Sequence, residues 1–146
     1  MSISRTASRT TKRDSDPFVD LDIDKAWHGI HFPLTGSAEP ADLPGASSTQ
    51  AGNEIDEGCG YGPARGFTRS EVKQIAEMLA AADEATLRSR YDPHVMTRDE
   101  VYPSDIWERR PPEDDPLGYL IEYYIMLRKF IMDAAQADEA LLAYFG

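Results

Sequence analysis

Cysteine is almost absent from this chain of 146 residues, and long apolar runs are missing altogether. The single cysteine, Cys59, excludes an internal disulfide and a cysteine-based zinc site, which suits a reducing compartment. No window approaches the roughly 18 consecutive apolar residues of a membrane-spanning helix, and no apolar segment of the signal-peptide type follows the start. We therefore expect a soluble protein of the cytoplasm.

Positive charge is also scarce, because 15 Lys and Arg stand against 26 Asp and Glu, for a formal net charge of −11. A surface with this charge repels DNA, RNA and anionic lipid, so neither nucleic acids nor membranes are expected as partners. The first thirteen residues are the exception, with four basic side chains and no acid. Because they carry no apolar periodicity, we predict a disordered basic tail over residues 1–16 and one folded domain over residues 17–146.

Helical patterns dominate the second half of the chain. Thr68 and Glu71 have the spacing of a capping box, which predicts a helix that begins at Arg69. Asp92-Pro93 ends a second, short helix and begins a further turn or two. The widest apolar stripe predicts the longest helix from about Pro116 to Ala135, packed in the core.

Strand signals are fewer and shorter. The last apolar run, Ala140 to Phe145, predicts a closing strand that is buried on both faces. Residues 35–60 are rich in Gly, Pro, Ser and Ala, which predicts a long loop. The expected fold is therefore a small, helix-rich single domain of the α+β class, with a small sheet that includes the C-terminal strand.

Acid–base chemistry is concentrated between residues 21 and 32. If Asp24 caps a helix, His28 and His31 lie three apart on one face, and the carboxylate could orient an imidazole. No third ligand is recognisable, so no metal site is expected. The structural alternative is that the neighbouring Trp27, Ile30 and Phe32 fill the core while the histidines satisfy backbone groups.

Other candidate residues form no complete catalytic set. The glycine-rich turn before Arg65 lacks the dinucleotide and P-loop patterns, so no cofactor is expected, and Cys59 has no recognisable base. Tyr102 and Trp107 flank a turn that suits either a recognition loop or an aromatic core anchor. The acidic run 113–115 suits a cation, a partner or the dipole of the following helix.

Several motifs in order resemble the bacterial YfbM-like family, a family of unknown function. They are LDIDKAWHGIHFPLTG, GYGPARGFT, EVKQIAEMLA, LRSRYDP, VYPSDIW and the terminal ALLAYFG, and they span about Leu21 to the end of the chain. The resemblance implies a small α+β domain and supplies no catalytic residues. It also implies that an N-terminal strand and helix of the family are absent here, which would leave an edge of the C-terminal strand uncovered and favour a homodimer through that edge.

Two functions remain open. The leading hypothesis is a non-catalytic module that binds a basic protein partner, for example as an inhibitor or immunity-type protein, because the acidic body steers such an association. Its expected binding residues are Tyr61, Arg65, Tyr102, Trp107, Glu113, Asp114 and Asp115. The alternative is a small hydrolase or transferase with a site around Asp22, Asp24, His28 and His31, in which Tyr61 and Arg65 hold an anionic substrate. A degenerate, inactive relative is a third reading.

Overall fold

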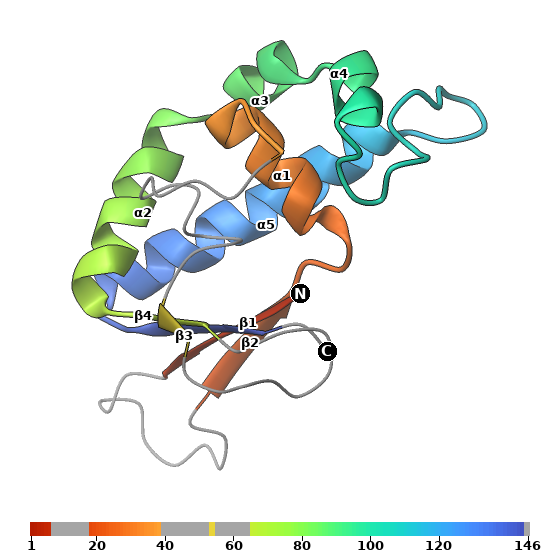
Figure 1. Ribbon diagram of the computed structural model, residues 1–146. Helices are drawn as coiled ribbons and strands as arrows, with labels where there is room; N and C mark the ends of the chain where they lie inside the picture. The colour runs from red at the N-terminus through yellow and green to blue at the C-terminus, as the bar shows by residue number, and fades with distance from the viewer. Residues whose placement is uncertain (7–17, 39–52, 55–64, 145–146) are drawn as a thin grey trace.

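The computed structural model describes residues 1–6, 18–38, 53–54 and 65–144 of the chain. Helices lie on one side of a twisted antiparallel sheet, so the expected α+β class is confirmed (Figure 1). The elements run in the order β1 Ser2–Thr6, β2 Phe18–Asp22, α1 Ala26–Thr35, β3 Asn53–Glu54, β4 Arg65–Phe67, α2 Arg69–Ala81, α3 Glu84–Arg90, α4 Pro93–Arg98, α5 Pro116–Gln136 and β5 Leu141–Tyr144.

The start of the chain is a strand and not a tail. The sheet has the order β2-β1-β5-β4-β3, so β1 lies between two neighbours and pairs antiparallel with both. Ile3 is 2% exposed and packs in the core, and Ser4 is also buried. The prediction of a disordered tail was wrong for residues 2–6, because pairing with distant strands supplies the stabilisation that local sequence lacks; residues 7–16 lie outside the described part.

The C-terminal strand is covered on both edges. β5 pairs with β1 on one side and with β4 on the other. The expectation of an uncovered edge, and of a homodimer through it, therefore loses its structural basis. The missing strand inferred from the family resemblance is present as β1, which also explains why so apolar a segment as β5 is tolerated.

The helices begin where local chemistry predicts. The backbone N–H of Thr68 donates to the Glu71 carboxylate at 2.7 Å, and the Glu71 N–H donates back to the Thr68 hydroxyl at 3.3 Å, so the capping box of α2 is confirmed. Asp92 caps α4, and Asp115 caps α5. The long helix and the closing strand are also confirmed, each to within a residue or two. The expected burial of the strand holds for one face only, because Leu141 and Ala143 are buried while Leu142 between them is half-buried.

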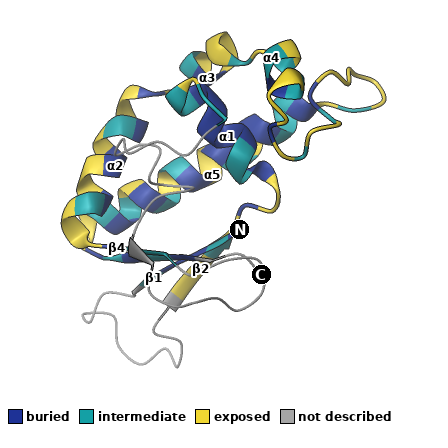
Figure 2. Ribbon diagram, viewed as in Figure 1, coloured by how far each residue is buried: buried dark blue, intermediate teal, exposed yellow. Residues whose placement is uncertain are grey.

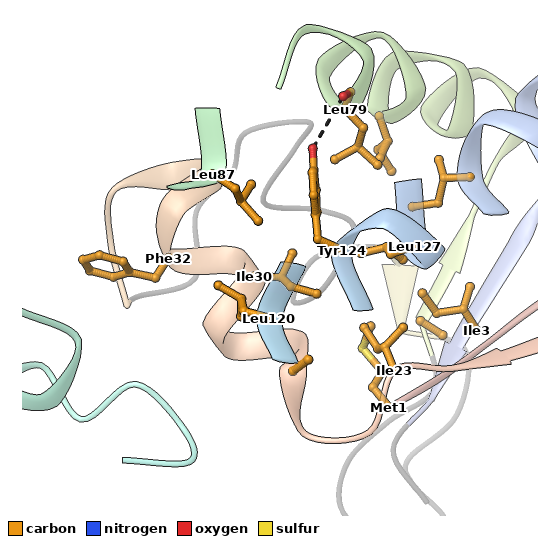
Figure 3. Close-up of a cluster of buried hydrophobic side chains, with 14 of the residues drawn as sticks. Met1, Ile3, Ile23, Ile30, Phe32, Leu79, Leu87, Leu120, Tyr124 and Leu127 are labelled. Atoms are coloured by element: carbon orange, nitrogen blue, oxygen red, sulfur yellow. Dashed lines mark hydrogen bonds between the residues drawn. The ribbon is translucent and has the colours of Figure 1, made fainter. Parts of the chain in front are cut away.

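Helix α5 is the centre of the hydrophobic core. Its buried side chains pack against α1, α2 and α3, and the first strand closes the core from below (Figures 2 and 3). Leu120, Tyr124 and Leu127 of α5 are fully buried, as are Ile30 of α1 and Leu79 of α2. No helix among the described residues is long and apolar enough to cross a membrane.

Of the expected loop over residues 35–60, only part is described. Thr35 is the last residue of α1, and Asn53–Glu54 forms the short edge strand β3, antiparallel to β4. Residues 39–52 and 55–60 lie outside the described part. The loop prediction is thus wrong for residues 53–54 and is not tested for most of the rest.

Candidate functional site

The turn that precedes α1 uses its carboxylates to hold the backbone. The Asp22 side chain accepts a hydrogen bond from the Asp24 N–H at 2.8 Å, and Asp24 has a positive φ of 49°. The α-amino group of Met1 donates to the Asp24 carbonyl oxygen at 2.8 Å and lies 3.7 Å from the Asp22 carboxylate. Lys25, and not Asp24, occupies the position before the helix, so the expectation that Asp24 caps it was wrong.

The Asp24 carboxylate is bound to a tyrosine and not to a histidine. The Tyr119 hydroxyl of α5 donates to it at 2.8 Å. Burial is the larger cause that raises the pKa of Tyr119 well above its usual range, and the hydrogen bond to a carboxylate raises it further. Because it is bound to Tyr119, the Asp24 carboxylate links the turn before α1 to α5. It does not orient His28, as the hydrolase or transferase hypothesis requires.

Backbone groups occupy both ring nitrogens of His28. Its Nδ1 accepts a hydrogen bond from the Tyr102 N–H at 2.9 Å, so in the neutral ring Nε2 carries the proton and donates to the Ala38 carbonyl oxygen at 2.8 Å. The ring also stacks on Trp27, with centroids 5.0 Å apart. These contacts match the structural alternative, in which the imidazole satisfies backbone groups between two loops.

The second histidine lies in the interior. His31 is fully buried, with its ring centroid 6.3 Å from that of His28. The two rings are therefore neighbours, as the spacing predicted, but only the first reaches the surface. Within the described ranges no group of three or more His, Cys, Asp or Glu side chains could hold a metal ion.

The two aromatic candidates of the 102–107 turn have different environments. Tyr102 is 43% exposed and stacks on Trp27, with centroids 6.0 Å apart, so it remains available to a partner. Trp107 is 1% exposed, and its Nε1 donates to the Val101 carbonyl oxygen at 2.6 Å. Including Trp107 among the binding residues was wrong, because an indole that fills the core cannot contact a partner.

Two of the three carboxylates in the acidic run 113–115 already form hydrogen bonds within the fold. Asp114 accepts a hydrogen bond from Arg109 at 3.2 Å, and Asp115 caps α5 by accepting one from the Gly118 N–H at 2.9 Å. Glu113 is exposed, and no interaction with another described residue engages it. The three carboxylates thus have different roles, and Glu113 is the one that a partner could use without cost to the fold.

Two surface features were not predicted from the sequence. Glu100 is exposed beside α4, with a positive φ of 52°, and like Glu113 it has no bond to another described side chain. Ile125, Met126 and Met132 are exposed on α5, where the apolar stripe is wider than the core can cover.

Of the remaining candidates, Arg65 lies in β4 opposite Glu54, while Tyr61 and Cys59 lie outside the described residues.

Comparisons with known proteins place the fold. The structure resembles a solved protein of unknown function, YfbM from Escherichia coli, with a TM-score of 0.64 and 19% identity over 99% of this chain and 98% of that one. Together with the presence of β1, that coverage contradicts the expected loss of an N-terminal strand. A search of curated proteins finds no match. The sequence profile of the domain of unknown function DUF1877 matches residues 4–144, and the chain belongs to that family.

Proposed function

We propose that this YfbM-like protein is a non-catalytic cytoplasmic module that binds a basic protein partner, as an inhibitor or immunity-type protein does. The observation that carries the proposal is the acidic connection between α3 and α5. Residues 92–115 hold eight carboxylates against three arginines. Such a density of one sign steers the diffusional encounter with a partner of the opposite sign.

The internal bonds of this connection support a defined binding surface. Arg109 donates to both Asp105 and Asp114, each at 3.2 Å, and Arg98 pairs with Asp99. The bond to Arg98 holds the pKa of Asp99 below its usual range. These ion pairs fix the conformation of the connection, while Glu100 and Glu113 stay exposed. The two carboxylates are therefore presented to a partner from a backbone of defined conformation.

The contacts of His28 give the enzyme alternative no support. Asp22 and Asp24 hold a turn, His28 binds two backbone groups, and His31 is buried. General acid–base catalysis needs an imidazole or a carboxylate that can exchange protons with a substrate. All four candidate side chains, however, already hold a turn, bind backbone groups or lie in the core.

Capture from a native lysate on the immobilised chain tests the proposal. The expected partner is a basic protein, and the double variant Glu100→Lys/Glu113→Lys should lose it, because two attractive charges become repulsive. Glu77→Lys, the same change on the exposed face of α2, should retain it. Retention of the partner by the double variant, or a substrate turned over by the chain and lost on His28→Ala, would refute the proposal.

A further inference from the structure

The outward side of α5 combines exposed apolar side chains with two opposite charges. Ile125, Met126 and Met132 are 49%, 43% and 38% exposed, which is high for residues of this kind in the longest helix of the fold. Glu122 and Lys129 are exposed on the same side. We call these five residues the α5 outer face.

The charges of this face are arranged symmetrically about its apolar centre. Glu122 and Lys129 are seven residues apart, which is two helical turns or about 10 Å, so they lie almost in line along the helix. The point midway between them falls between Ile125 and Met126. The face therefore has an acid at one end, Ile125 and Met126 in the middle and a base at the other end, where Lys129 pairs with Asp133 and Met132 lies beyond it.

We infer that the α5 outer face binds a second copy of this chain. In a two-fold dimer each surface must complement itself, so that residue i meets residue j and j meets i. When two α5 helices run antiparallel about the point between Ile125 and Met126, Glu122 of each copy faces Lys129 of the other. Two equivalent ion pairs then flank a shared apolar centre. A partner with only basic charges would instead place positive charge against Lys129 and be repelled by it.

A groove beside the face enlarges the contact. It has a volume of about 450 Å³ and lies between the start of α3 and α5, with Ile125 and Met132 on its wall. Lys129 already reaches Asp133 at 2.6 Å, but both side chains are solvent-exposed, and an exposed pair of this kind is worth only about 0.3–0.5 kcal/mol. Lys129 can therefore turn to Glu122 of the second copy at little cost.

The net charge of −11 does not prevent this association. At physiological salt the Debye length is about 8 Å, so repulsion between the acidic connections at one end of each molecule is largely screened. The facing charges across the proposed contact are closer than this and of opposite sign. The dimer is independent of the proposed binding of a basic partner, which uses the connection between α3 and α5.

Sedimentation equilibrium of the full chain at about 50 μM in 0.15 M salt tests the inference. We expect a mass twice that of one chain for the unmodified protein. Glu122→Lys and Lys129→Glu should each weaken the dimer by about tenfold or more, because two attractive pairs become two repulsive ones. The double variant Glu122→Lys/Lys129→Glu should dimerise again, since it only exchanges the two charges.

Two controls separate the contact from the fold. Glu77→Lys makes the same charge change on α2 and should leave the dimer intact. Thermal melting at low concentration should be close to that of the unmodified chain for Glu122→Lys. A monomeric unmodified chain, a dimer insensitive to both single variants, or a double variant that melts normally and stays monomeric would overturn the inference.

Discussion

The Nδ1 atom of His28 in α1 accepts a hydrogen bond from the Tyr102 N–H, seventy-four residues further along the chain, at 2.9 Å. This bond requires a ring protonated on Nε2 when the imidazole is neutral, with that proton directed at the Ala38 carbonyl. Long-range ¹⁵N–¹H NMR spectra at neutral pH should show the Nε2–H tautomer for His28. The Nδ1–H tautomer, or rapid exchange between the two, would contradict the structural role.

Replacement of His28 separates the structural role from the catalytic one. His28→Ala leaves the Tyr102 N–H and the Ala38 carbonyl without their partner, which should lower the free energy of unfolding by about 1–3 kcal/mol. Urea denaturation measures this loss, and partner binding should fall only as far as folding does. A variant as stable as the unmodified chain would show that these bonds are not formed.

Gly29 is required by the ring that packs on it. A Cβ at this position would lie 2.3 Å from Cη2 of Trp107 and 2.7 Å from Cδ1 of Leu120. Gly29→Ala gains about 1 kcal/mol of helix propensity but should lose more through overpacking, for a net destabilisation of about 1–3 kcal/mol.

A double-mutant cycle checks the cause of that loss. If the indole is the obstacle, Gly29→Ala should cost less in a Trp107→Phe background, because the smaller ring leaves room for the added methyl group. Chemical denaturation of the four proteins gives the coupling energy. An equal cost of Gly29→Ala in both backgrounds would place the clash elsewhere.

The first strand should be essential for folding. Ile3 is buried on β1, which lies between β2 and β5, whereas Val19 on the neighbouring edge strand β2 is 42% exposed. Ile3→Ala should lower the free energy of unfolding by about 2–5 kcal/mol, and the matched Val19→Ala by about 0.5 kcal/mol or less. Equal, small effects of the two substitutions would restore the view that the chain begins with a dispensable tail.

Tyr124 should make the protein lose stability in alkali. Its hydroxyl donates to the Ala82 carbonyl and lies 3.5 Å from that of Leu79, and burial raises its pKa from 10 to about 12 (Figure 3). Between pH 10 and 12 the unfolded chain releases this proton while the folded chain keeps it, so stability should fall as pH rises through this window.

The matched variant for that window is Tyr124→Phe. It should be less stable at pH 8 by about 1 kcal/mol, because the hydrogen bond is lost, but its stability should fall less between pH 10 and 12. Some fall should persist, since burial also raises the pKa of Tyr91 to about 12. Parallel pH profiles for the two proteins would show that the Tyr124 hydroxyl is not buried.

Local signals predicted the helices well and the sheet poorly. The capping box at Thr68 and the stripe of α5 depend on residues a few positions apart, and both are found where expected. β1 is short and polar in sequence, and its place in the sheet depends on β5 at the opposite end of the chain. The contacts of His28 and Trp107 are likewise non-local, so the sequence could name these residues as candidates but could not decide their roles.

The salt dependence of partner association tests the proposed function most directly. With the captured partner in surface plasmon resonance, the association rate should fall steeply between 50 and 200 mM salt, because charges at the rim of a contact act mainly on encounter. Glu100→Lys/Glu113→Lys should remove most of that dependence, while Glu77→Lys keeps it. An association rate that is unchanged by salt and by the double variant would contradict binding through the acidic connection between α3 and α5.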